Sequence, residues 1–215
     1  MKKITIAFLL CLGGWMLSAQ PAVPISLKNP SFEDAPHHSH TPKGWENCGF
    51  EGESPADVHP SGEFGVEKGA AHGKTYLGMV VRDNDTWECI GQPLPQPLRV
   101  DTCYRVDFLA CRSPKYISLS RATNQQANYN TPVVIRIWGG YEDKEKEGFE
   151  MLAESKPIAN TDWEKFELFF TSGEPYDYLY LEAYFDPGRP NPYNGNVLVD
   201  EFSGIVPCSW IIEKK

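Results

Sequence analysis

Apolar and polar side chains alternate with a period of two along much of this 215-residue chain, and no other feature restricts its fold as strongly. Side chains of an extended strand point to opposite faces in turn, so each alternating run predicts a strand with one buried face. The pattern is longest over residues 178–185. The other predicted strands cover residues 76–81, 87–92, 104–110, 133–138, 149–153, 165–170 and 196–202. No segment has the pattern of a helix longer than two turns, so we expect an all-β fold.

The turn residues favour a sandwich of two sheets. Eighteen glycines, eighteen prolines and 13% aromatic residues are typical of many short strands joined by tight turns. This pattern predicts an antiparallel two-sheet β-sandwich, as a single domain over residues 20–215 with its core at about 23–207. Three connections, 28–66, 112–131 and 187–196, are long for a compact domain, and we expect them to be either functional or disordered.

The first 19 residues have the features of a secretory signal peptide. A basic start precedes an apolar run over residues 4–12, and Ala19 offers a small residue for cleavage. The apolar run is too short to cross a membrane comfortably. We therefore expect an exported protein without a transmembrane span in the mature chain, located in the periplasm, at the outer membrane or outside the cell.

Five cysteines remain after the predicted signal peptide, so at least one stays unpaired within a monomer. They are Cys48, Cys89, Cys103, Cys111 and Cys208. Cys103 and Cys111 lie at the two ends of one predicted strand, about 26 Å apart at ~3.3 Å per residue, and cannot bridge. For a domain of this size we favour buried thiols over a disulfide framework, and the pairing stays open.

Charge and motifs exclude several classes of function. A net charge of −9 is a poor match for a phosphate backbone, so nucleic acid is not expected as a partner. Neither a nucleophile elbow nor a zinc-protease motif occurs. His37, His38 and His40 could attract a transition metal, but no Cys or acid is spaced to complete a tetrahedral site, and a polar loop is the favoured interpretation.

Several short segments occur in a distinctive order along the chain. Asn-Pro-Ser-Phe-Glu at 29–33 is followed by Gly-Trp at 44–45, and Asn-Val-Leu-Val-Asp-Glu-Phe stands at 196–202. Between them lie Gly-Lys-Thr-Tyr-Leu-Gly at 73–78 and the stretches at 90–94 and 103–106. Taken in order, these segments resemble the opening, the core strands and the last strand of the carbohydrate-binding jelly rolls of the galactose-binding-like superfamily. The chain is also similar to a domain of bacterial cell-envelope proteins. The resemblance implies a two-sheet antiparallel jelly-roll β-sandwich.

The resemblance further implies a structural Ca²⁺. In that family the Glu of the opening motif and the Asp of the last strand approach each other, which makes Glu33 and Asp200 the carboxylate ligands, with backbone carbonyls near Asn29 and Lys74. Hard oxygen donors from both ends of the chain suit Ca²⁺. The alternative is that Glu33 caps a turn and Asp200 pairs with a Lys or Arg.

The outward side chains of the predicted strands provide candidate ligand-binding groups. Flat rings can stack on the C–H face of a sugar, while charged groups bond its hydroxyls. The candidate residues are Arg82, Trp87, Arg112, Tyr116, Arg136, Trp138, Glu182 and Tyr184. The alternative is structural, because Tyr and Trp are good strand formers and a Glu182–Arg136 pair would simply stabilise the sheet.

The sequence therefore predicts a non-catalytic, exported glycan-binding module that uses an aromatic and polar outer face. The alternative is a cell-envelope domain that binds a protein partner. A third possibility is a polysaccharide lyase or hydrolase, in which Tyr184 would act as the base beside Arg136, although a fold alone does not confer chemistry.

Overall fold

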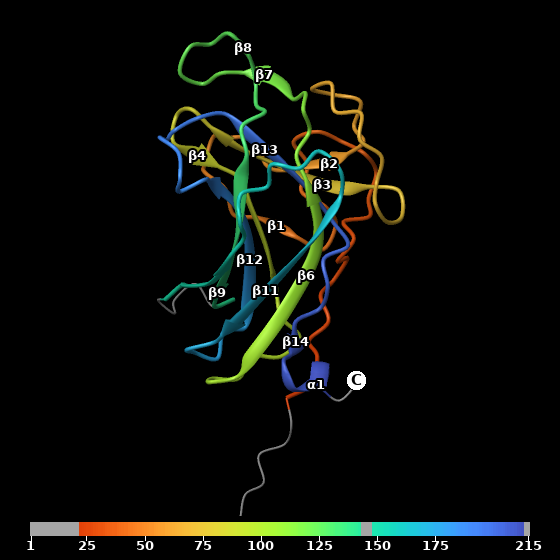
Figure 1. Cartoon of the computed structure of the whole chain (residues 1–215), viewed down its shortest axis with the longest axis vertical. Coiled ribbons are helices and arrows are strands. Elements are labelled where there is room, and N and C mark those ends of the chain that lie inside the picture. Colours follow the sequence, from red (N-terminus) through yellow and green to blue (C-terminus); the bar gives the residue numbers. More distant parts are fainter. Residues whose placement is uncertain (1–21, 143–147, 213–215) are drawn as a thin grey trace, which may run out of the picture.

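The computed structural model describes residues 22–142 and 148–212, which form two antiparallel sheets packed face to face (Figure 1). A small third sheet lies at one end of the sandwich, and a short C-terminal helix lies at the other (Figure 1). The predicted signal peptide falls outside the described residues. Among these residues, no helix has the length and apolar character needed to cross a membrane.

The first sheet has five strands in the order β1-β5-β12-β9-β10. Its strands are β1 (Glu46–Asn47), β5 (Cys89–Pro93), β12 (Tyr178–Phe185), β9 (Val133–Gly140) and β10 (Glu150–Glu154). β12 pairs with β9 over the whole predicted run 178–185. This sheet positions the candidate site described below.

The second sheet has the order β11-β6-β13-β3-β2, with β14 beside β6 and β4 beside β3. Its strands are β11 (Glu164–Thr171), β6 (Cys103–Cys111), β13 (Gly195–Asp200), β3 (Tyr76–Arg82), β2 (Asp57–His59), β14 (Val206–Pro207) and β4 (Thr86–Trp87). The remaining elements are the pair β7 (Ile117–Leu119) and β8 (Gln126–Asn128) and the helix α1 (Ser209–Ile212). Pairing between the named strands is antiparallel, which confirms the predicted all-β jelly-roll sandwich.

The core lies between the two sheets and is filled by the apolar halves of the alternating strands. Phe108 stacks on Phe166 and on Phe202, with ring centroids 5.6 and 5.5 Å apart, and Leu181 of the opposite sheet is fully buried. Each such side chain contributes about 1.5–3 kcal/mol by leaving water. Because these faces are used in the core, the other face of each strand points outward.

One predicted strand, 87–92, is divided at Glu88. The backbone N–H of Glu88 donates to Val80 of β3, while its carbonyl accepts from Ala183 of β12. The chain thus passes from the second sheet to the first at this residue, with β4 on one side and β5 on the other. Alternation alone cannot reveal such a crossing, because it continues through the bend.

The long connection at 112–131 is ordered and covers the outer side of the second sheet. It contains β7 and β8, and it buries Tyr116 and Tyr129 against Tyr76 and Leu198. This cover explains why β13 is buried along its whole length and not on one face alone. The loop is therefore a structural element of the sandwich.

The preference for free thiols is wrong for four of the five cysteines. Disulfides join Cys48 to Cys89 and Cys103 to Cys208, which bring together residues that are 41 and 105 positions apart. Cys111 is the expected unpaired cysteine, and burial raises the pKa of its thiol to about 12. Sequence spacing excluded one wrong pair but could not detect the right ones, since they depend on how distant strands pack. Two disulfides fit an exported protein.

We predict that the Cys103→Ala/Cys208→Ala double variant loses about 2–5 kcal/mol in free energy of unfolding, because this bond restricts a long loop of the unfolded chain. Denaturant unfolding followed by circular dichroism measures the loss. The matched variant Cys48→Ala/Cys89→Ala removes the bond that closes a shorter loop. On loop entropy alone, its free energy of unfolding should fall by about 0.8 kcal/mol less. A larger loss from the Cys48–Cys89 pair would contradict this account.

Candidate functional site

The outer face of the five-stranded sheet gathers most of the predicted ligand-binding residues. β12 lies between β5 and β9, and its register places Tyr180 opposite Trp138 and places Glu182 opposite both Arg136 and Cys89. The alternate residues of β12 are buried in the core, so these side chains point away from it. The face thus consists of cross-strand rows, which are the units through which side chains on a sheet interact.

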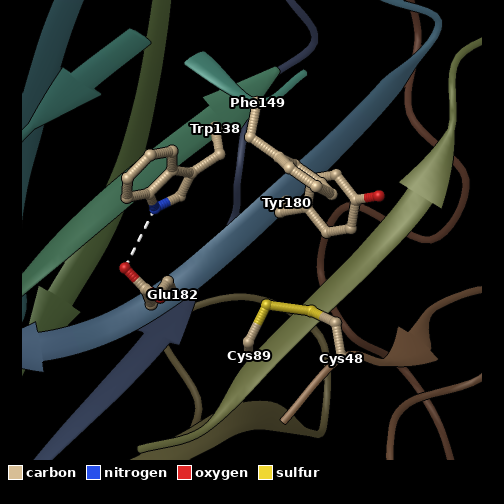
Figure 2. A pocket seen from close by; sticks show the side chains of 6 residues that line it. All are labelled: Cys48, Cys89, Trp138, Phe149, Tyr180 and Glu182. Carbon is tan, nitrogen blue, oxygen red and sulfur yellow. Dashed lines mark hydrogen bonds between the residues drawn. A yellow bond between two sulfur atoms is a disulfide. The ribbon is translucent and has the colours of Figure 1, made fainter. Parts of the chain in front are cut away.

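Glu182 organises this face by accepting two indole hydrogen bonds. The indole N–H of Trp87 donates to one carboxylate oxygen at 2.6 Å, and that of Trp138 donates to the other at 2.9 Å (Figure 2). An ionised carboxylate accepts through both oxygens, so it can serve both donors together. Trp87 reaches Glu182 from β4, where the chain crosses between the sheets.

Arg136 is held by three contacts. Its Nε donates to Glu154 at 2.7 Å, its Nη1 lies 4.0 Å from Glu182, and its guanidinium carbon lies 3.5 Å above the ring centre of Tyr184. Planar guanidinium groups favour both ion pairing and stacking on aromatic faces. The cross-strand pair that the structural interpretation predicted is therefore present, within a wider network.

Beside this network lies an open cavity of about 370 Å³. Its lining residues are Cys48, Cys89, Trp138, Phe149, Tyr180 and Glu182 (Figure 2). The Cys48–Cys89 disulfide forms one side, and Phe149 and Tyr180 meet edge to face with ring centroids 5.4 Å apart. Phe149 is 66% exposed, so a large aromatic surface at the cavity faces solvent.

Two glycines allow Tyr180 to lie across neighbouring strands. A Cβ on Gly91 would lie 2.9 Å from the Tyr180 ring, and one on Gly140 would lie 2.7 Å from it and 3.0 Å from Phe149. The two distances to the Tyr180 ring are shorter than real Cβ contacts, so the ring occupies space that the side chain of any other residue would fill. The position of this cavity wall depends on the two glycines.

Burial sets the ionisation of the central carboxylate. It raises the pKa of Glu182, while the two indole donors and Arg136 act in the opposite direction. The side chain is 12% exposed, so desolvation of the charged form is the larger effect. Protonation would also disturb the indole bonds, because a carboxylic acid turns one acceptor oxygen into a donor.

The structure brings five of the predicted ligand-binding residues together. These are Trp87, Arg136, Trp138, Glu182 and Tyr184. In the sequence, each of these residues lies on the outward side of an alternating strand or at the end of a neighbouring strand. The pairing of β12 with β9 and β5 then assembled them.

The other three predicted residues lie elsewhere. Arg82 is 3% exposed on the second sheet, where it is paired with Glu88. Tyr116 is 4% exposed and donates its hydroxyl to a carboxylate in the same buried region, while Arg112 donates from Nε to a backbone carbonyl at 3.0 Å. These three groups are used in the internal hydrogen bonds of the fold.

Sequence reasoning missed Phe149 and the disulfide as cavity residues. Phe149 lay at the start of a predicted strand, but its contact with Tyr180 follows from the order of strands within the sheet. Tyr180 lies within the predicted strand 178–185, and its place in the cavity depends on the same strand order. The sequence carried no local signal for the pairing of Cys48, which directly follows β1, with Cys89, which begins β5, because the two residues are 41 positions apart.

The predicted calcium ligands lie against one loop but are occupied by hydrogen-bond donors. Asp200 accepts from the Ser31 hydroxyl and from the backbone N–H groups of Ala71, His72 and Glu201, at 2.7–2.9 Å. Four donors fill the lone-pair directions of a carboxylate. Asp200 thus does not fit a Ca²⁺ ligand as it is folded, and through these bonds it ties the end of β13 to Ser31 and to the loop at residues 71–72.

The contacts of Glu33 match the alternative interpretation, in which its carboxylate caps a turn. Its carboxylate accepts from the backbone N–H of Lys74 at 2.9 Å, next to the loop that Asp200 holds. In the described part of the chain, no set of three or more His, Cys, Asp or Glu side chains is placed to hold a metal ion. Calcium binding stays a prediction, and the donor arrangement weighs against it.

The rings of the three histidines in the opening loop contact one another, with His37 stacked on His38 and edge to face with His40. The ring centroids of His37 and His38 lie 5.1 Å apart, and those of His37 and His40 lie 5.6 Å apart. His37 also exchanges two backbone hydrogen bonds with Val58, each 2.9 Å long. These contacts tie the loop to β2.

Comparison with known proteins identifies the architecture. No family model matches the chain, and no curated protein matches its sequence. The K2 cleaved adhesin domain of Lys-gingipain is similar, with a TM-score of 0.52 and 11% identity over 81% of this chain and 96% of that one. The tandem CBM22-1–CBM22-2 domain of Paenibacillus barcinonensis Xyn10C has a TM-score of 0.51 and 16% identity, over 88% of this chain and 47% of that chain. This chain has the β-sandwich fold of carbohydrate-binding modules.

We predict that lowering the pH through the raised pKa of Glu182 changes tryptophan fluorescence, because protonation removes an acceptor from an indole N–H. The midpoint should lie above the ordinary glutamate value of about 4.3. The folded state binds this proton more readily than the unfolded state, so the wild type should gain stability relative to Glu182→Gln as pH falls.

Two variants separate this titration from others nearby. Glu182→Gln should abolish the fluorescence change, whereas Glu154→Gln, which alters the partner of Arg136 without touching an indole, should retain it. Persistence of the transition in Glu182→Gln would show that another group causes it.

We predict that excess chelator leaves the melting temperature unchanged, since the oxygens of Asp200 are already occupied. Differential scanning calorimetry with EDTA and then with added Ca²⁺ measures this. A metal bound only by the folded state would stabilise it. A fall in melting temperature that Ca²⁺ reverses would restore Glu33 and Asp200 as ligands.

Proposed function

We propose that this chain is an exported, non-catalytic glycan-binding module that holds a sugar in the cavity on the outer face of the five-stranded sheet. The observation that carries the proposal is the exposed ring of Phe149 beside Tyr180 and Trp138, in an open cavity of about 370 Å³. Sites for small ligands are mostly apolar and of about 300–1,000 Å³. The cavity fits that class in size and in the apolar character of its walls.

The rings suit a sugar for a physical reason. The C–H face of a pyranose ring is apolar and can cover an aromatic face, while its hydroxyls stay at the rim. The hydrogen bonds that the indoles of Trp138 and Trp87 donate to Glu182 restrain these two rings. Gly91 and Gly140 leave room for the ring of Tyr180 across the neighbouring strands. Rings held in place before binding lose little conformational freedom when the ligand arrives.

The non-catalytic part of the proposal rests on the contacts of Tyr184 and Arg136, the candidate catalytic base and its neighbour. Arg136 is bound to Glu154 and lies over the ring of Tyr184, so it is not aimed at a substrate in the cavity. Tyr184 is further packed by Trp87, with centroids 4.8 Å apart. The fold shared with carbohydrate-binding modules supports the same interpretation, although folds of this kind host many functions.

A protein partner is the second candidate. Met151 lies opposite Trp138 in the β9–β10 pairing and is 46% exposed, and it extends the apolar surface beyond Phe149. Aromatic and Met side chains are enriched in protein interfaces. A cell-envelope protein with an apolar side chain could therefore use the same cavity.

Affinity electrophoresis in gels that contain neutral polysaccharides tests the proposal, and Phe149→Ala is the decisive variant. Loss of one stacking ring should weaken binding about 5–30-fold, which corresponds to roughly 1–2 kcal/mol. Phe149 is largely exposed, so the fold should remain intact.

Phe169→Ala provides the matched control, because Phe169 is 54% exposed on β11 of the other sheet. It should retain full retardation. An equal loss of polysaccharide binding in Phe149→Ala and Phe169→Ala would contradict the glycan proposal. So would a wild-type protein that no polysaccharide retards. Recovery of an envelope protein that Phe149→Ala fails to retain would then favour the second candidate.

A further inference from the structure

We infer that the cavity selects neutral glycans and rejects acidic ones such as uronic-acid or sulfated polysaccharides. The inference rests on the proposed function and names the class of ligand for that site. It comes from the charges that the described residues place around the cavity, where carboxylates lie next to the ligand and the arginine of the outer strands is already paired.

The cation of the face is already occupied. Among the outward residues of β5, β9 and β12, Arg136 is the sole Lys or Arg. Its guanidinium contacts Glu154 at 2.7 Å, Glu182 at 4.0 Å and the ring of Tyr184 at 3.5 Å. An anionic ligand would have to break these contacts to gain an ion pair. Proteins that recognise carboxylate or sulfate groups instead keep an Arg fork free for them.

Two carboxylates of the described residues lie at or beside the cavity. Glu182 lines the cavity itself, with a side chain that is 12% exposed. Glu46 of β1 lies in the row of Gly91 and Tyr180, and accepts the hydroxyl of Tyr178 at 3.1 Å. An acidic sugar would bring a like charge towards carboxylates in a partly desolvated place, where screening by water is weak.

The polar group that remains for a ligand is neutral. Both oxygens of Glu182 accept indole N–H bonds, so they are committed to the protein. The hydroxyl of Tyr180 has no hydrogen bond to another described residue, and Figure 2 shows it directed away from Glu182. Burial, with Asp177 and Glu46 nearby, raises the pKa of Tyr180, which keeps the phenol protonated. A phenol hydroxyl can donate to and accept from a sugar hydroxyl.

Affinity electrophoresis with pairs of polysaccharides that differ mainly in charge tests the inference on the purified protein. The pairs are hydroxyethylcellulose with carboxymethylcellulose, methyl-esterified with de-esterified homogalacturonan, and unsubstituted xylan with glucuronoxylan. For at least one pair, the neutral member should retard the protein at a concentration at least tenfold lower than the acidic member. The difference between these two concentrations should become smaller as added salt screens the carboxylates.

A charge-removing variant tests whether Glu46 contributes to the discrimination. Glu46→Gln keeps an acceptor for Tyr178 and removes the charge, so the ratio of acidic to neutral dissociation constants should fall at least threefold. Glu164→Gln removes the same charge from an exposed position of β11 in the other sheet and should leave the ratio unchanged.

The outcomes separate this inference from the function on which it rests. Preference for the acidic members, or equal binding of both, overturns the neutral selectivity while the glycan-binding function stands. An unchanged ratio in Glu46→Gln also overturns the charge mechanism. Failure of every polysaccharide to retard the wild type overturns both proposals together.

Discussion

Each sheet of this protein buries one face against the other sheet, and the rest of the structure depends on what covers the opposite face. The apolar halves of the alternating strands meet in the core, which leaves the other halves to solvent, to the β7–β8 cover or to a ligand. The second sheet uses its outer face for the buried cluster around Tyr76 and Leu198. On the first sheet Phe149 is largely exposed, and the outer face holds the cavity.

On that open face, one buried carboxylate orders the aromatic residues. Glu182 loses hydration on burial, which raises its pKa, and it regains hydrogen bonds from two indoles. The arrangement restrains Trp87 and Trp138, which come from strands of different sheets. Because the same carboxylate lines the cavity, the proposed preference for neutral ligands depends on the group that also organises the rings.

Predictions from the sequence were accurate where a property depends on neighbouring residues in the chain, and they failed where it depends on residues that are distant in sequence. Alternation located the strands well, and it assigned Trp138 and Glu182 to an outer face. It failed at Glu88, because the bend that moves the chain between sheets preserves the alternation. It also could not separate Arg82, which is paired with Glu88 inside the fold, from a charged group that faces a ligand. Both cases depend on which segment covers the residue.

The sequence by itself determined the all-β class, the period-two strands and the supply of outward aromatic residues, because these properties depend on neighbours along the chain. Tertiary structure alone decided that Cys48 joins Cys89, that Phe149 meets Tyr180, and that Tyr116 is buried. Those outcomes depend on strand order and on which loops cover which face. A local pattern carries no record of either, since the residues involved are distant in sequence and meet only when the two sheets close.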